Sequence, residues 1–185
     1  SEDFAAAFTG IGKAQAVWLW AGEQRLVHLT VAGTDGAPLD PNAALYRNLL
    51  AAIDGARPPH QPLRVSPCLD LRFGLTAGLW IAPEYEAEKV LAAAGQALAA
   101  AFGFAARAFG QQVTGSEVLA VLQGVAGVIG ADLDKLIQVE SELTVLTSNG
   151  PDGSIPARSA RWQGNSLQPA DLLLLDPTAI TLTER

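Results

Sequence analysis

Residues 69–81 read LDLRFGLTAGLWI, and they carry the clearest pattern in the sequence. Apolar side chains occupy every second position from Leu69 to Ile81, so an extended chain places all of them on one face. We therefore predict a long strand with one buried face. Gly74 and Gly78 fall on the other face, where a glycine permits a bend or the close approach of another backbone.

Shorter elements are predicted on both sides of this strand. A helix is expected to start after Thr114, because Thr114 and Glu117 have the spacing of a capping box, and Gly127 is predicted to end it. The other predicted elements are a short helix in residues 1–9, a hairpin of strands 14–20 and 25–31, helices over 40–55 and about 83–102, and strands over 128–139 and around 179–183.

This order of helices and strands predicts an α+β protein, with helices packed on one face of a small antiparallel or mixed sheet. Two such units, residues 1–67 and 68–185, fit the length, and Pro67 marks the division. Residues 148–168 are rich in glycine, proline and serine, and no regular element is predicted in them. We interpret them as an irregular arm inserted before the final strand.

Composition narrows the possible partners. The chain has 185 residues, of which 49% are hydrophobic, so it can bury a sizeable core. Its 12 basic and 19 acidic residues give a net charge of −7. This charge disfavours binding to nucleic acid and to anionic membrane surfaces. The single cysteine cannot form an internal disulfide, and we expect folding in a reducing compartment.

Few residues in the sequence could support catalysis or metal binding, and they are scattered along the chain. His28 and His60 lie far apart in the sequence, and Cys68 has no adjacent partner for nucleophilic chemistry, so we interpret all three as structural. Asp132 and Asp134 share one face of a strand and could hold a divalent ion, but a solvent-facing role is favoured. We predict no catalytic, cofactor-binding or metal site and no enzymatic activity.

The tryptophans leave an alternative open. Large aromatic side chains on strands are more often core or interface residues than ligand-binding ones. Trp18, Trp20 and Trp80 could nevertheless line a pocket. The alternative is therefore a small-molecule- or metal-binding α+β domain with enzymatic activity that uses these tryptophans together with Asp132 and Asp134.

Three collinear segments resemble the baseplate J-like family of contractile phage tails and related injection systems. The middle segment, AARAFGQQVTGSEVLAVLQGVAGVIGADLDKL, resembles the C-terminal region of that family through Phe109–Gln111, Ser116–Val118 and Gly127–Val128. The segments SEDFAAAFTGIGKAQAVWLW and LQPADLLLLDPTAITLT resemble the family's helix–turn–strand unit and its closing segment. Family members are longer, and their upstream part is absent from this sequence.

The resemblance implies a fold and a role. It implies ferredoxin-like topology in both units. It also implies a structural wedge component of a baseplate, assembled in the bacterial cytoplasm into a virion or a phage-tail-like particle. The implied partners are other wedge proteins, copies of the same chain, and hub or sheath-proximal proteins. Neither nucleic acid nor a membrane is an expected partner.

One candidate interface lies in the predicted arm. Trp162 is the only large aromatic residue of that arm, and Arg158 and Arg161 flank it. Buried tryptophan and arginine dominate the energetics of many interfaces. Trp162 either folds back onto its own domain or anchors the arm in an adjacent wedge subunit, and both interpretations remain open at this point.

Overall fold

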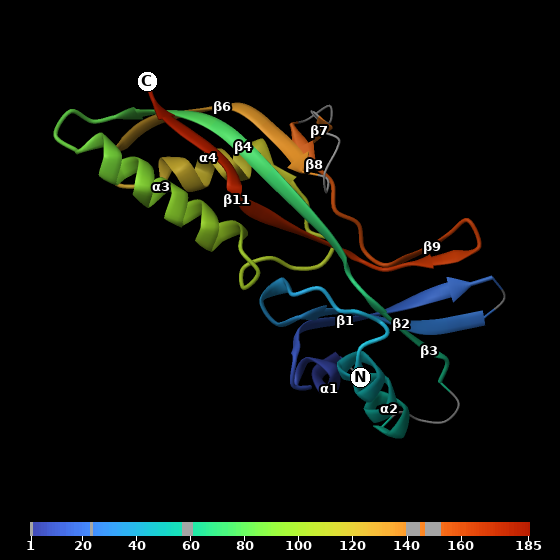
Figure 1. The fold of residues 1–185 in the computed structure, drawn as a ribbon. Helices are drawn as coiled ribbons and strands as arrows, with labels where there is room; N and C mark the ends of the chain where they lie inside the picture. Colours follow the sequence, from blue (N-terminus) through green and yellow to red (C-terminus); the bar gives the residue numbers. More distant parts are fainter. Residues whose placement is uncertain (1, 23, 57–60, 140–144, 147–152) are drawn as a thin grey trace. The chain divides into compact units, whose positions relative to one another are not determined.

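The computed structural model describes residues 2–22, 24–56, 61–139, 145–146 and 153–185, and Figure 1 traces the chain. The protein is α+β, as the sequence predicts. It divides into two compact units, of which the first comprises Ser1–Asp70 and Arg158–Leu172 and the second comprises Leu71–Ala157 and Leu173–Arg185. The sequence instead predicts units 1–67 and 68–185. The main difference is Arg158–Leu172, which belongs to the first unit.

The first unit contains a three-stranded sheet in the order β1-β2-β3. β1 and β2 form the predicted antiparallel hairpin, and β3 runs parallel to β2. Helix α2 makes the crossover between β2 and β3. The elements are α1 (Glu2–Ala6), β1 (Ile11–Ala21), β2 (Gln24–Gly33), a 3-10 turn at Thr34–Gly36, α2 (Ala44–Ala56) and β3 (Leu63–Pro67).

The core of the first unit lies between the sheet and its helices. Leu29 and Val31 of β2 pack against Tyr46, Leu49 and Ile53 of α2, all of them buried. These three helix residues recur at intervals of three and four, which places them on one face of α2. The Tyr46 hydroxyl donates to the Val65 carbonyl at 2.8 Å, which ties α2 to β3.

The second unit contains a four-stranded sheet in the order β11-β4-β6-β7. Two helices cover one face of this sheet, and Figure 1 shows α3 and α4 beside each other there. The elements are β4 (Leu69–Ile81), α3 (Ala87–Phe102), β5 (Val113–Thr114), α4 (Gly115–Gln123), β6 (Val128–Val139), β7 (Val145–Leu146), β8 (Ser154–Ile155) and β11 (Asp171–Glu184).

Strand β4 confirms the prediction made from residues 69–81. Phe73, Leu75, Ala77 and Leu79 are fully buried beneath α3 and α4. Gly74 lies on the opposite face, where a Cβ atom would come within 2.6 Å of the Ala179 carbonyl oxygen of β11. The absence of a side chain at Gly74 therefore allows β11 to pair closely with β4, in agreement with the predicted close approach.

Two predictions about chain connections are wrong. Helix α4 ends at Gln123 with Gly124 as its C-cap, whereas Gly127 lies three residues later at φ +90° in the turn into β6. The described part of the predicted arm is not irregular, since residues 153–168 include β8, β9 (Arg161–Gln163) and β10 (Ser166–Gln168). Residues 148–152 lie outside the described residues. Composition missed β8 because its partner β5 is distant in the sequence, whereas β9 and β10 pair with each other in a local hairpin.

The element order differs from the ferredoxin-like one. A ferredoxin-like unit has the order β-α-β-β-α-β. The first unit runs α-β-β-α-β before its returning segment, and in the second unit α3 and α4 are separated by residues 103–114, which contain one strand, the two-residue β5. No β-hairpin therefore lies between α3 and α4. The protein is α+β, but the order of its elements is not the ferredoxin-like one.

Candidate interaction site

The β9–β10 hairpin of the first unit carries the sequence-predicted interface residue Trp162. Gly164 and Asn165 form its two-residue turn, and both have positive φ, at 57° and 66°. Asparagine and glycine tolerate this conformation, which suits tight hairpin turns. Trp162 and Leu167 are directly opposite each other in the hairpin. The Gly-Asn pair in WQGNSL is the signal that could have predicted this hairpin from the sequence.

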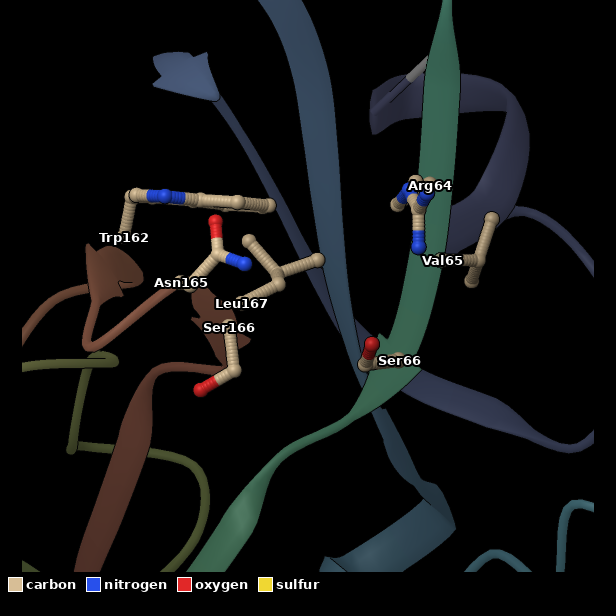
Figure 2. Close-up of a pocket in the computed structure, with 7 residues that line it drawn as sticks. All are labelled: Arg64, Val65, Ser66, Trp162, Asn165, Ser166 and Leu167. Carbon is tan, nitrogen blue, oxygen red and sulfur yellow. The ribbon is translucent and has the colours of Figure 1, made fainter. Parts of the chain in front are cut away.

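A cavity of about 600 Å³ separates this hairpin from β3. Figure 2 shows Trp162, Asn165 and Leu167 on one side of the cavity and Arg64 and Ser66 on the other. Trp162 is half-buried, and Arg64 is exposed. Within the described residues, the Arg64 guanidinium makes no hydrogen bond or ion pair. The cavity therefore combines an indole, a leucine and a cation that is available to a partner.

Backbone and side-chain contacts hold the returning segment in the first unit. The Arg158 amide donates to Asp171 Oδ2 at 2.7 Å, and the Asp171 amide donates back to the Arg158 carbonyl at 2.9 Å. The Ala170 amide donates to Thr30 Oγ1 on β2 at 3.2 Å. These bonds bring the hairpin beside β1 and β2, which explains why Arg158–Leu172 belongs to the first unit.

The two predicted arginine partners of Trp162 do not line the cavity. Arg158 is exposed, whereas Arg161 donates to Gln163 Oε1 at 3.1 Å and to the Ser159 carbonyl at 3.4 Å. Sequence reasoning missed Arg64, which lies almost a hundred residues before Trp162 in the chain. The candidate site consequently consists of Trp162 and Arg64, with Asn165, Ser66 and Leu167 around them.

His28 is fully buried on β2. Its Nδ1 lies 3.4 Å from Thr30 Oγ1, and its Nε2 has no partner among the described residues. Burial penalises the charged imidazolium and lowers the pKa of His28 to about 4. His28 is therefore neutral at physiological pH.

The other two residues interpreted as structural are Cys68 and His60. Half-buried Cys68 follows β3, and its amide donates to the Val31 carbonyl. His60 lies outside the described residues.

Asp132 and Asp134 lie on β6 and face Arg185. The Arg185 guanidinium forms an ion pair and a hydrogen bond with Asp134, and it lies 3.7 Å from Asp132 Oδ2. Its guanidinium carbon lies 5.8 Å from the centre of the Trp80 ring. The single Arg185 cation thus pairs with both aspartates that the alternative function assigns to a metal ion, and it compensates one of their two negative charges. The described residues contain no cluster of three or more metal-ligating side chains.

The tryptophans that the alternative function groups together belong to different units. Trp18 and Trp20 lie on β1 of the first unit, where they are 56% and 65% exposed, and Trp80 lies on β4 of the second unit. The Arg25 guanidinium carbon is 5.0 Å from the centre of the Trp18 ring and 6.0 Å from that of Trp20. Exposed indoles stacked with arginine are typical of interfaces rather than of closed ligand sites.

Buried Arg107 is the residue that sequence reasoning missed entirely. It lies in the loop between α3 and β5 and is 2% exposed. Its guanidinium donates to Glu117 Oε1 at 2.7 Å and to the carbonyls of Gln111 and Gln112 at 3.1 and 2.6 Å. Thr114 Oγ1 accepts from the Glu117 amide at 3.1 Å, as predicted, whereas the Glu117 carboxylate binds Arg107. The loop that contains Phe109–Gln111, which resembles the family motif, is therefore fixed by the buried Arg107 side chain.

Comparison with known proteins identifies the first part of the chain. Residues 1–66 match the sequence model of the baseplate J-like central domain. This match is to the family that the sequence resembles, although the matched domain is the central one rather than the C-terminal region. No curated protein matches the chain. No helix within the described residues is long and apolar enough to cross a membrane. Residues 1–66 thus resemble the baseplate J-like central domain, and this match supports a structural role in a phage baseplate.

Proposed function

We propose that this protein is a wedge component of the baseplate of a contractile phage tail or a phage-tail-like injection system, joining wedge subunits around the hub. The match of residues 1–66 to the baseplate J-like central domain carries this proposal. The proposed partners are copies of the same chain, other wedge proteins, and hub or sheath-proximal proteins. Assembly takes place in the bacterial cytoplasm before the particle is released.

The cavity between β3 and the β9–β10 hairpin supplies one contact for such a role. A side chain of a neighbouring subunit that enters the cavity would cover the Trp162 indole and meet the Arg64 guanidinium. Exclusion of water strengthens charge-assisted hydrogen bonds of this kind. Arg158 and Arg161 remain candidates for the rim of the contact, where charges tune the association rate more than the affinity.

Many such contacts need not be individually strong. A ring repeats each interface by symmetry, so weak contacts accumulate into a stable assembly through multivalency. The isolated chain is therefore expected to be monomeric or weakly associating. Weak repeated contacts can also break when the tail contracts, whereas one tight interface would resist that change.

Particle incorporation of a Trp162→Ala variant tests the proposal. We expect at least tenfold less of the variant than of the wild type in purified particles, with an unchanged fold by circular dichroism. Trp80→Ala serves as the matched control, because Trp80 is a partly exposed tryptophan of the second unit. Wild-type incorporation of Trp162→Ala excludes the cavity contact, and purified particles that lack the protein altogether contradict the baseplate role itself.

A further inference from the structure

The cavity between β3 and the β9–β10 hairpin lies on one face of the first-unit sheet. Thr30 accepts the Ala170 amide, whereas Leu29, its neighbour on β2, packs against α2. The returning segment therefore lies on the sheet face opposite α2. Ser66 pairs with Thr30 in the parallel register, and Arg64 lies two residues before Ser66. The register thus places both side chains on the face that carries the hairpin (Figure 2).

The charged and aromatic groups of the cavity supply hydrogen-bond donors. The Arg64 guanidinium has N–H donors and no acceptor, and the Trp162 indole has one N–H donor. Neither side chain forms a hydrogen bond or an ion pair with a described residue, and the described lining residues include no carboxylate. A carboxylate is the planar acceptor that a guanidinium binds through two parallel hydrogen bonds. The cavity is therefore suited to a carboxylate side chain.

The acidic residues of the chain are concentrated in the second unit. The first unit contains 7 basic and 8 acidic residues, whereas the second contains 5 basic and 11 acidic residues. A cationic cavity in one unit and an excess of carboxylates in the other favour a head-to-tail contact, in which the second unit of one copy meets the first unit of another. Such a heterologous contact can repeat from copy to copy around a ring.

Glu84 lies at the tip of an exposed turn between β4 and α3. The Tyr85 amide donates to the Ala82 carbonyl at 2.9 Å and closes this turn. The Ala82 amide in turn donates to the Gly127 carbonyl at 2.9 Å, which anchors the turn to the start of β6. Pro83 and Glu84 are its exposed central residues, and proline fixes the backbone at the first of these positions. The turn therefore presents Glu84 without a flexible loop that binding would have to order.

Several other carboxylates of the second unit already interact within the chain. Glu88 lies in the first turn of α3, where the helix N-terminus stabilises a negative charge. Other acidic residues are paired, namely Glu86 with Lys89, Glu117 with Arg107, Asp176 with Thr178, and Asp132 and Asp134 with Arg185. Glu84 forms no hydrogen bond or ion pair with a described residue, so its carboxylate is available to another copy.

We propose that Glu84 of one copy enters the cavity of a second copy and pairs there with the Arg64 guanidinium beside the Trp162 indole. The contact itself follows from the cavity and the turn, whereas its place in a ring rests on the proposed baseplate role. A single ion pair with one indole is a weak contact, which agrees with a chain that assembles firmly only when a ring repeats the contact.

Exchange of the two charges tests the contact in the purified protein. We expect sedimentation at low ionic strength to show self-association of the wild type with a Kd of about 1 mM or below. Arg64→Glu or Glu84→Arg alone should weaken this association about tenfold or more, because each brings like charges together. An equimolar mixture of the two variants should associate as the wild type does, since each cavity then meets a turn of opposite charge.

Arg47→Glu and Glu88→Arg are the matched controls. Both residues are exposed, and their substitutions change the net charge as the test variants do, but Arg47 lies on α2 and Glu88 lies beyond the turn. Neither control should change the association by more than about twofold, because exposed charges outside a contact are screened by salt. Circular dichroism checks that all four variants are folded.

Distinct results overturn the proposal. A wild type that stays monomeric at about 1 mM excludes the contact, and loss of Arg64→Glu from particles would then assign the cavity to a different protein. Equal weakening by the control variants, or a mixture that does not restore association, shows that Arg64 and Glu84 do not pair. Purified particles that lack the protein contradict the baseplate role and the ring, but not a contact measured in solution.

Discussion

Arg107 and Glu117 form a salt bridge of 2.7 Å across the loop that joins α3 to α4, and the Arg107 side chain is only 1% exposed. The guanidinium also lies 5.4 Å from the Phe102 ring at the end of α3. One side chain thus contacts the end of one helix, the loop carbonyls and the first turn of the next helix. The conformation of residues 103–114 depends on this buried charge.

Replacing Arg107 with methionine should destabilise the protein by about 3 kcal/mol, because removing one partner of a buried pair leaves polar groups without hydrogen bonds. Glu117→Gln should cost only about 1 kcal/mol, since an amide oxygen still accepts a hydrogen bond. Urea unfolding of both variants and of the double variant measures the coupling free energy between Arg107 and Glu117. Additive losses would show that the salt bridge does not act as a unit.

Thr114→Ala should destabilise the protein by about 1 kcal/mol through loss of the N-cap of α4. The Thr114 Oγ1 atom accepts the Glu117 amide at 3.1 Å, and alanine leaves that amide without its acceptor. Thr114→Ser retains the oxygen and should stay close to the wild type. Chemical denaturation compares the three proteins, and equal stability of the alanine and serine variants would exclude a capping role.

Gly127→Ala should cost about 2 kcal/mol, because residues other than glycine are strained at positive φ. The added Cβ atom would also lie 2.7 Å from the Tyr85 ring and 3.0 Å from Val90. Gly153→Ala is the matched control, since Gly153 has φ +62° with no atom within 4 Å of the new Cβ. Thermal unfolding should show the larger loss for Gly127→Ala, and equal losses would mean that Tyr85 moves aside.

Stability should fall as the pH drops from about 6.5 to about 4 because of His28. Its folded-state pKa of about 4 is below the ordinary value of 6.5, so the unfolded chain takes up the proton first and is favoured in this window. The stability contributed by neutral His28 is complete above pH 6.5, and its loss reaches at most about 3 kcal/mol.

A His28→Gln variant separates this effect from carboxylate titration. Its unfolding free energy should change less than that of the wild type between pH 7 and pH 4.5. Proton NMR of the His28 ring reports the folded-state pKa directly. A midpoint near 6.5 in the folded protein would contradict the burial argument.

Divalent metal ions should not raise the melting temperature, because the Arg185 guanidinium already pairs with both Asp132 and Asp134. A specific site filled at a hundredfold excess over its Kd would stabilise the protein by about 2.7 kcal/mol. A thermal-shift screen with Mg²⁺, Mn²⁺, Zn²⁺ and Ca²⁺ measures this. A large, saturable shift that Asp132→Asn abolishes would favour the alternative metal-binding function.

The sequence by itself determined those elements that depend on neighbouring residues. The alternation in residues 69–81 predicted β4 with its observed bounds, and Thr114 predicted the start of α4. The hairpin of β1 and β2 followed from two strand-forming runs around a short turn. These features are local, because side-chain period, capping and turn chemistry act within a few residues.

Only the tertiary structure decided which distant residues meet. Thr30 binds the Ala170 amide across 140 positions, and Arg185 binds Asp134 across 51. The first contact helps to bring Trp162 into the first unit opposite Arg64, and the second pairs an arginine with one of the two aspartates that looked available to a metal. No local pattern encodes such pairs, because their free energy arises from burial and hydrogen bonding that exist only after the chain has closed long loops.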